Sequence, residues 1–239
     1  MSSAALVNRL DPGQHAAARL AGILYLAGNV VAAFSEFHAR GSLIVPDDAA
    51  QTAVNVRASE LLFRIGMVGD LVTFSSGLVL VWALYVVLRP VGRDLVLLAA
   101  FFRLAECAVL ASITLNDFTA LRLLGGASYL RALDTQQLQA LARLFMGVQA
   151  DGYRIGLVLF GLGSAVFAWL WYKSCYIPRV LAALGIFASL LVAILTLAIM
   201  VFPGLGSMVI PAYYVPVLLF EVSLGLWLLA KGLRAPEPA

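Results

Sequence analysis

Six long apolar segments, separated by connections of different lengths, constrain this chain more than any other feature of its sequence. The segments cover about residues 17–37, 61–88, 94–117, 152–172, 178–201 and 212–229. A helix needs about 20 apolar residues to cross the hydrocarbon layer of a bilayer. The runs are continuous, whereas strands of a membrane β-barrel alternate polar and apolar residues over short segments. The sequence therefore predicts an all-α polytopic membrane protein, a bundle of six transmembrane helices.

The composition agrees with this prediction. Hydrophobic residues make up 62% of the 239 residues, charged residues make up 12%, and the mean hydropathy is +0.96. An ordinary soluble domain has about 45–50% apolar and about 25% charged residues. The formal net charge of +3 is small and spread along the chain, so it gives no case for nucleic acid as a partner. The expected partner is the lipid bilayer.

The bundle is expected to occupy residues 17–233, between a flexible tail over 1–16 and a short tail over 234–239. Short interfacial amphipathic helices complete the predicted fold. One begins after Pro46, because Asp47 and Asp48 suit the positive end of a helix dipole. It either ends before the second apolar segment or runs into it.

A second amphipathic stretch follows the third apolar segment. Asp134 or Thr135 can cap a helix there. Apolar residues recur at helical spacing, at Leu138, Leu141, Leu144 and Phe145. Two interpretations stay open, a helix lying at the membrane interface or the projecting start of the fourth membrane helix.

Six crossings place both termini on one side of the membrane, and the positive residues of the connections predict which side. The terminal side carries Arg9, Arg19, Arg89, Arg93, Lys173, Arg179, Lys231 and Arg234. The opposite connections carry Arg40, Arg57, Arg122, Arg131 and Arg143. Because positive residues accumulate in the cytoplasm, the termini are expected to be cytoplasmic.

The third apolar segment has two charged residues at its centre, Arg103 and Glu106. They are three residues apart and therefore share one face of a helix. Charge at membrane depth is costly, so such groups are expected to face protein or a wet cavity and to mark a functional site. Glu221 falls near the middle of the sixth segment, and Asp70 lies about 14 Å from the outer end of the second.

Further charged residues lie closer to the outer surface. Asp117 is eleven residues after Glu106, about three helical turns, and shares its stripe. Two pairs have the spacing of helical ion pairs, Asp151 with Arg154 and Glu60 with Arg64. The candidate ligand-binding or proton-carrying set is Arg64, Asp70, Arg103, Glu106, Asp117, Asp151, Arg154 and Glu221.

Two interpretations of this set stay open. In the first, the charges are buried ion pairs that fix one helix packing. In the second, they line a pocket for a small polar or anionic ligand, with Arg103 as charge partner and Glu106, Asp70 or Glu221 as proton carriers. Glu221 has no basic residue elsewhere in its segment, so it needs a partner from another helix or must be protonated. Tyr25 and Asn29 in the first segment are better explained by helix–helix hydrogen bonds than by ligand binding.

The motifs of known membrane enzymes are missing. His15 and His38 are the only histidines, too few for an intramembrane zinc hydrolase. Intramembrane aspartyl proteases have Gly-x-Gly-Asp and Tyr-Asp, whereas here Gly66-Met-Val-Gly69 precedes Asp70 and no Tyr-Asp occurs. No phosphate-binding or dinucleotide-binding glycine motif is present. The sequence therefore predicts no bound metal or cofactor and disfavours an enzyme.

Seven blocks of the sequence have a recognisable pattern. In chain order they are RLAGILYLAG, RGSLIVPDDAAQTAVNVRASELLFRIGMVGDL, LYVVLRPV, LAAFFRLAE, YRIGLVLFGL, YIPRVL and LLFEVSLGLWLLAKGLR. These blocks resemble a bacterial membrane family catalogued as domain of unknown function 4386. The resemblance covers about residues 17–233 and implies a six-helix integral protein of the bacterial inner membrane. It supplies no activity, so it assigns no role to any residue.

Three function classes follow from the sequence. The first is a protein that binds or transports a small polar or anionic molecule, coupled to protons through Glu221, Glu106 or Asp70. The second is a non-enzymatic structural subunit or chaperone of a larger membrane complex. The third, disfavoured by the missing motifs, is a membrane-embedded enzyme. No feature of the sequence identifies a protein partner.

Overall fold

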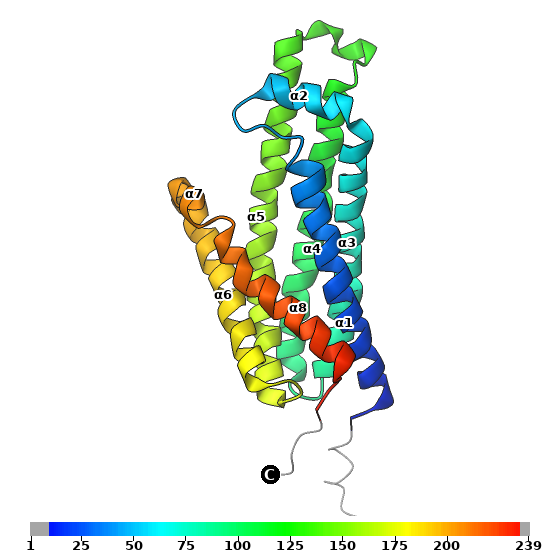
Figure 1. Ribbon diagram of the computed structural model, residues 1–239, viewed down its shortest axis with the longest axis vertical. Coiled ribbons are helices and arrows are strands. Elements are labelled where there is room, and N and C mark those ends of the chain that lie inside the picture. The colour runs from blue at the N-terminus through cyan, green and yellow to red at the C-terminus, as the bar shows by residue number, and fades with distance from the viewer. Residues whose placement is uncertain (1–9, 235–239) are drawn as a thin grey trace, which may run out of the picture. The chain divides into compact units, whose positions relative to one another are not determined.

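The computed structural model describes residues 10–234, which form helices and connections without a β-strand (Figure 1). In chain order the elements are α1 (Pro12–Ala33), the π-helix η2 (Phe34–Arg40), α2 (Ala49–Ala58), α3 (Glu60–Leu88), α4 (Arg93–Leu124), the 3₁₀ helix η3 (Ser128–Ala132), α5 (Thr135–Ser174), α6 (Arg179–Val201), the 3₁₀ helix η4 (Pro203–Leu205), α7 (Gly206–Val209), the 3₁₀ helix η5 (Ala212–Tyr214) and α8 (Val215–Ala230).

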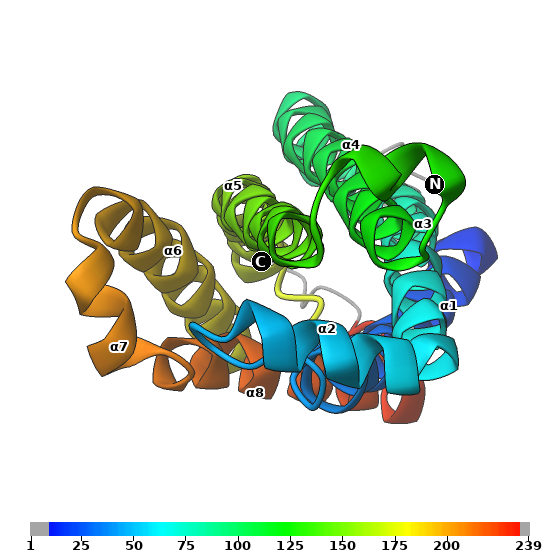
Figure 2. The same cartoon turned by 90° about the horizontal axis from the view of Figure 1, so that it is seen from above.

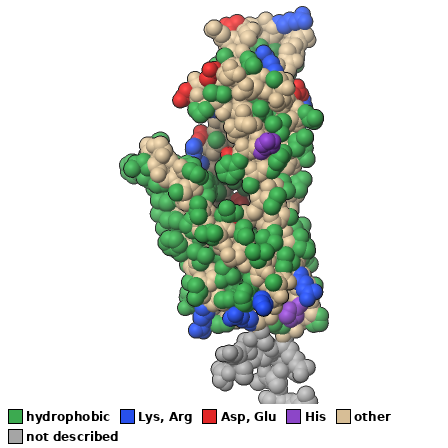
Figure 3. Space-filling model, viewed as in Figure 1, with side chains coloured by type: hydrophobic (Ala, Val, Ile, Leu, Met, Phe, Trp, Pro, Cys, Tyr) green, Lys and Arg blue, Asp and Glu red, His purple; other side chains and the backbone are tan. Residues whose placement is uncertain are grey.

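Six helical stretches are long and apolar enough to cross a membrane, which confirms the predicted fold class. They are Pro12–Arg40, Glu60–Leu88, Arg93–Leu124, Thr135–Ser174, Arg179–Val201 and Ala212–Ala230. Large apolar side chains stay exposed along α6, including Val180, Phe187 and Ile194. Figure 3 shows hydrophobic side chains covering this helix. Such a surface suits contact with lipid.

The first helix starts earlier than the predicted boundary at Ala17. α1 begins at Pro12, and the N–H of Asp11 donates to Oε1 of Gln14 at 3.0 Å. That contact is half of a capping box, and proline is favoured at a first helical position. Pro12 therefore starts the helix. Residues 1–9 and 235–239 of the predicted tails lie outside the described residues.

Both predicted amphipathic helices are present, each with its cap. The side chain of Asp48 accepts a hydrogen bond from the N–H of Gln51 at 2.8 Å and caps the start of α2. A single residue separates the end of α2 from the start of α3. The side chain of Asp134 accepts from the N–H of Gln137, also at 2.8 Å, and starts α5. α5 then continues to Ser174, so this stretch is the projecting start of the fourth membrane helix.

The chain divides into two compact units. Within the described residues, unit 1 consists of 10–29, 76–106 and 157–234, and unit 2 consists of 30–75 and 107–156. In unit 1, α6 and α8 pack together and are joined at one end through α7 (Figure 1). The largest fully buried side chains of the unit 1 core are Trp171, Leu84, Leu88, Leu170, Ile177, Leu224 and Leu228.

Unit 2 has its own apolar core, built from Phe63, Met67, Leu121 and Met146 among others. Three apolar positions of the start of α5 pack against it, Leu138, Leu141 and Phe145, whereas Leu144 is exposed. Figures 1 and 2 show α2 lying across the direction of the unit 2 parts of α3, α4 and α5. This orientation is the one predicted for a helix at the membrane interface.

Candidate functional site

The Arg103 and Glu106 side chains form a buried ion pair on α4, as their spacing predicted. Nη1 of Arg103 lies 2.8 Å from Oε2 of Glu106, and the two side chains are 9% and 8% exposed. The guanidinium of Arg103 lies 4.5 Å from the ring centroid of Phe160 on α5, a cation–π contact. The stem of Arg103 fits against Gly163, where an added Cβ would lie 2.9 Å from Cγ of the arginine.

Glu221 on α8 has its partner on another helix, the amide of Asn29 on α1. Nδ2 of Asn29 donates to Oε2 of Glu221 at 3.0 Å and to the carbonyl oxygen of Tyr25 at 2.8 Å. Glu221 also interacts electrostatically with Arg103 and with Glu106. We call Asn29, Arg103, Glu106 and Glu221 the Arg103 centre.

Glycines let α1 and α8 approach closely enough to build this contact. An added Cβ at Gly22 would lie 2.9 Å from the carbonyl oxygen of Gly225, and one at Gly225 would lie 3.0 Å from Leu26. Small residues at a helix contact allow such a close approach of two backbones. The ion pair of Arg103 and Glu106 also lies well inside the membrane-spanning stretch of α4. Counted from the start of α4, Arg103 is about 15 Å and Glu106 about 20 Å along the helix.

A second charge centre lies in unit 2 around Arg40. Nη2 of Arg40 lies 2.7 Å from Oδ2 of Asp70 and 2.9 Å from Oδ2 of Asp117, and Nη1 lies 3.2 Å from Glu36. Asp117 is 1% exposed, so this carboxylate is withdrawn from solvent. We call Glu36, Arg40, Asp70 and Asp117 the Arg40 centre.

Arg40 was predicted to lie in a connection, and that prediction was wrong. η2 extends the first helix in π geometry and ends at Arg40. The signal that could have found it is the four-residue spacing of Glu36 and Arg40, which suits a helical ion pair. Glycines on α3 bring η2 close, since an added Cβ at Gly66 would lie 2.7 Å from Cβ of Ala39.

The remaining candidate residues form exposed pairs in unit 2. Nη2 of Arg64 lies 2.6 Å from Oε1 of Glu60, and each side chain is 51% exposed. Arg154 pairs with Asp151, which is 71% exposed. Measured along α5, Asp151 precedes the last residue of the helix by about 35 Å of helical rise. Because the hydrocarbon layer is about 30 Å thick, this pair belongs at the membrane interface.

The two centres share one property, a shortage of positive charge. The Arg103 centre holds one guanidinium with Glu106, which is buried, and Glu221, which is partly buried. The Arg40 centre holds one guanidinium with two buried carboxylates, Asp70 and Asp117. An ionised carboxylate away from water needs a compensating charge. Each centre therefore holds one more carboxylate, buried or partly buried, than it has guanidinium groups.

Within residues 10–234, no group of three or more His, Cys, Asp or Glu side chains is arranged to hold a metal ion. No curated protein and no solved structure matched the chain. The sequence model of the family described as Domain of unknown function (DUF4386) matches residues 20–232, nearly the whole chain. This multi-pass membrane protein therefore belongs to the DUF4386 family.

Proposed function

We propose that the protein is a proton-coupled carrier for a small polar molecule, and that Glu221 and Glu106 hold the exchangeable proton. The observation that carries this proposal is the charge count of the Arg103 centre, one guanidinium for two carboxylates. When two interacting carboxylates share one compensating charge, their protons are lost in coupled steps. Such a pair suits the exchange of a proton for another positive charge.

The same charge count favours a cationic or neutral polar ligand over an anionic one. An anion entering the Arg103 centre would meet two carboxylates, and its only cationic partner already pairs with Glu106 at 2.8 Å. A cation or a hydrogen-bond donor would instead supply the compensation that the second carboxylate lacks.

The proposal places the protein in the bacterial inner membrane with both termini in the cytoplasm. Its basis is the excess of Lys and Arg on the terminal side of the helices. In this proposal Arg64, Asp151 and Arg154 belong to ion pairs at the outer membrane interface. Asp70 and Asp117 form a second pair of carboxylates. The partners proposed here are the bilayer and the small polar solute.

Solute-driven proton movement tests this function. Purified protein is reconstituted into liposomes containing a pH-sensitive dye, and a panel of small organic cations and neutral polar solutes is added outside. We expect at least one solute to change the internal pH in the presence of the protein. Glu221→Gln should abolish that change, because the glutamine keeps the Asn29 contact but carries no exchangeable proton.

Glu60→Gln is the matched control for this assay. It makes the same chemical change at a carboxylate that is 51% exposed and paired with Arg64. The control should transport like the unaltered protein. Full activity of Glu221→Gln, or inactivity of the unaltered protein with every solute of the panel, would contradict the proposed function.

A structural role is the second candidate, favoured by the Arg40 centre. Two ion pairs shorter than 3 Å connect η2 to α3 and α4 within unit 2. Buried pairs of this kind select one packing of helices. A non-enzymatic subunit or chaperone of a larger membrane complex would need no more than that. Stoichiometric co-purification of another membrane protein in mild detergent would support this second candidate.

A further inference from the structure

A cavity of about 360 Å³ lies in unit 2, and its lining includes no residue of either charge centre. Its lining comes from α3, α4, the connection that follows α4 and η3. It consists of Arg64, Phe118, Leu121, Arg122, Gly125, Ala127 and Tyr129. Two arginines therefore share one small cavity with apolar and aromatic side chains. We propose that it binds the phosphate group of an anionic phospholipid.

The depth of the lining residues matches the headgroup layer. α3 and α4 are joined by a short turn, which gives a common origin for measuring along both helices. Arg64 lies about 36 Å from the end of α3 at that turn, and Arg122 lies about 44 Å from the start of α4. The hydrocarbon layer is about 30 Å thick, and the bilayer with its headgroups about 40–45 Å. Both guanidinium groups therefore reach the layer that holds lipid phosphates.

The charge of the cavity is positive. Arg122 forms no ion pair with any carboxylate in residues 10–234, and Arg64 pairs only with Glu60. Two guanidinium groups against one carboxylate leave one positive charge. Arg57 of α2 lies close by, since its Nε donates to the carbonyl oxygen of Leu124 at 3.1 Å. Arginine binds phosphate through paired N–H donors, and basic pockets between membrane helices bind anionic headgroups.

The apolar lining favours a lipid over a free phosphate ion. Phe118 is 43% exposed and precedes Arg122 on α4, one turn closer to the hydrocarbon layer, where a lipid chain would pass. Tyr129 is 69% exposed, and tyrosine is enriched where the headgroups meet the hydrocarbon. A free ion would make no use of either ring.

Native mass spectrometry of the detergent-purified full chain tests the site with phosphatidylglycerol and phosphatidylcholine as probes. The unaltered protein should retain phosphatidylglycerol over phosphatidylcholine. Each arginine near an anionic membrane surface contributes about a fivefold gain in binding. Arg122→Gln should therefore weaken phosphatidylglycerol retention about fivefold, and the double variant Arg64→Gln/Arg122→Gln about 25-fold.

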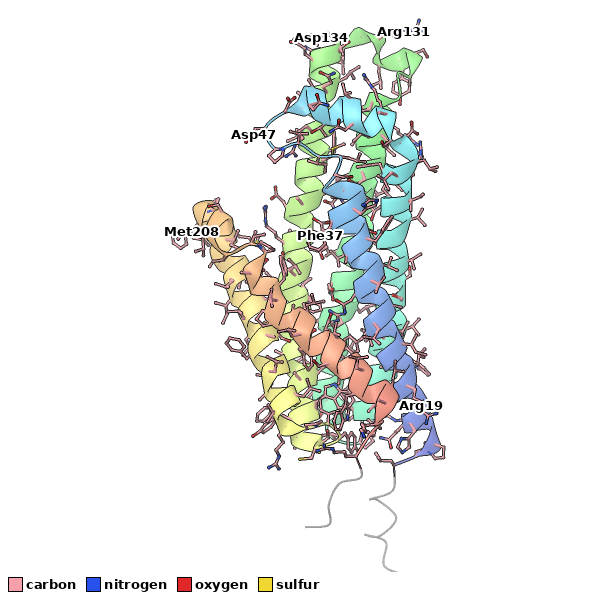
Figure 4. All side chains as sticks on the ribbon, viewed as in Figure 1. Arg19, Phe37, Asp47, Arg131, Asp134 and Met208 are labelled. Carbon is pink, nitrogen blue, oxygen red and sulfur yellow. The ribbon has the colours of Figure 1, made fainter. Side chains whose placement is uncertain are left out.

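Arg131→Gln is the matched control. Arg131 lies on η3 and does not line the cavity. Its labelled side chain lies at the top of the view in Figure 4. Its replacement should leave retention unchanged, and the melting temperatures of all variants are measured to show that they are folded. A third arm adds inorganic phosphate in large excess.

The lipid site is supported if Arg122→Gln and the double variant lose phosphatidylglycerol, Arg131→Gln retains it, and inorganic phosphate does not displace it. Equal retention in all variants overturns it, because Arg122 would then serve only the helix dipole at the end of α4. Displacement of phosphatidylglycerol by inorganic phosphate overturns the lipid assignment in favour of a free anion site. The transport assay with Glu221→Gln is independent of every one of these results.

Discussion

Arg103→Gln is expected to lower the free energy of unfolding by about 3–5 kcal/mol, the usual cost of removing one partner of a buried ion pair. Arg103 supplies the only guanidinium of its centre, and Glu106 and Glu221 both interact with it. Glutamine keeps much of the side-chain volume and leaves two carboxylates without a positive charge. Reversible denaturation in mixed detergent and SDS micelles measures the loss.

The pH dependence of this loss follows from the same reasoning. Without the guanidinium, a carboxylate of the variant must take up a proton to be buried. The free-energy cost of taking up that proton decreases as the pH falls. The deficit of Arg103→Gln should therefore be largest at high pH and shrink towards low pH. A deficit that does not change with pH would show that lost packing against Phe160 and Gly163 causes it.

Glu221→Gln is the matched control for Arg103→Gln. It removes the carboxylate in excess while keeping an acceptor for Nδ2 of Asn29, so it should cost less than about 1 kcal/mol. Combined with Arg103→Gln, it should recover part of the lost stability, because one fewer unpaired charge remains. If Arg103→Gln proves as stable as a variant of the exposed pair, such as Arg154→Gln, the Arg103 centre is not an electrostatic unit.

The second large effect is expected at Arg40. Arg40→Gln leaves Asp70 and Asp117 buried beside each other without a cation and should also cost about 3–5 kcal/mol. Arg64→Gln breaks a pair of similar length whose side chains are 51% exposed and should cost no more than about 1 kcal/mol. The same micellar denaturation compares the two variants.

A second substitution separates charge from packing at Arg40. Asp117→Asn neutralises the most buried carboxylate of the centre and should restore part of the stability lost in Arg40→Gln. If Asp117→Asn instead adds its own cost to that of Arg40→Gln, the two residues do not act as a pair. Equal stability of Arg40→Gln and Arg64→Gln would likewise contradict the role given to Arg40.

Local features of the fold were predictable because they depend on neighbours in the sequence. A cap at Asp134 or Thr135, a helix start after Pro46 and the shared face of Arg103 and Glu106 were predicted from residues close together in the sequence. In the structure Asp134 caps α5, Asp48 caps α2, and Arg103 pairs with Glu106. Length and hydropathy located the six membrane-spanning helices. The start of α1 was misplaced because Pro12 is favoured both in an irregular tail and at a first helical position.

The grouping of the charges could not be predicted, because it depends on contacts between distant segments. Asp117 shares a helical stripe with Glu106, yet its ion-pair partner is Arg40, 77 residues earlier in the chain. Arg40 was assigned to a connection because the first helix was predicted to end at residue 37. In the structure η2 continues that helix for three more residues, to Arg40. Asn29 is 192 residues from Glu221, and spacing gives no sign of that contact.

The most direct test of the central claim is an infrared measurement of the protonated carboxyl groups. At neutral pH the C=O stretching band of a buried carboxylic acid should be present in the unaltered protein, since the Arg103 centre has one carboxylate more than it has guanidinium groups. Glu221→Gln or Glu106→Gln should remove part of that band, and Glu60→Gln should not. A band that neither buried substitution changes would show that the Arg103 centre holds no proton, and the proposed proton exchange would be wrong.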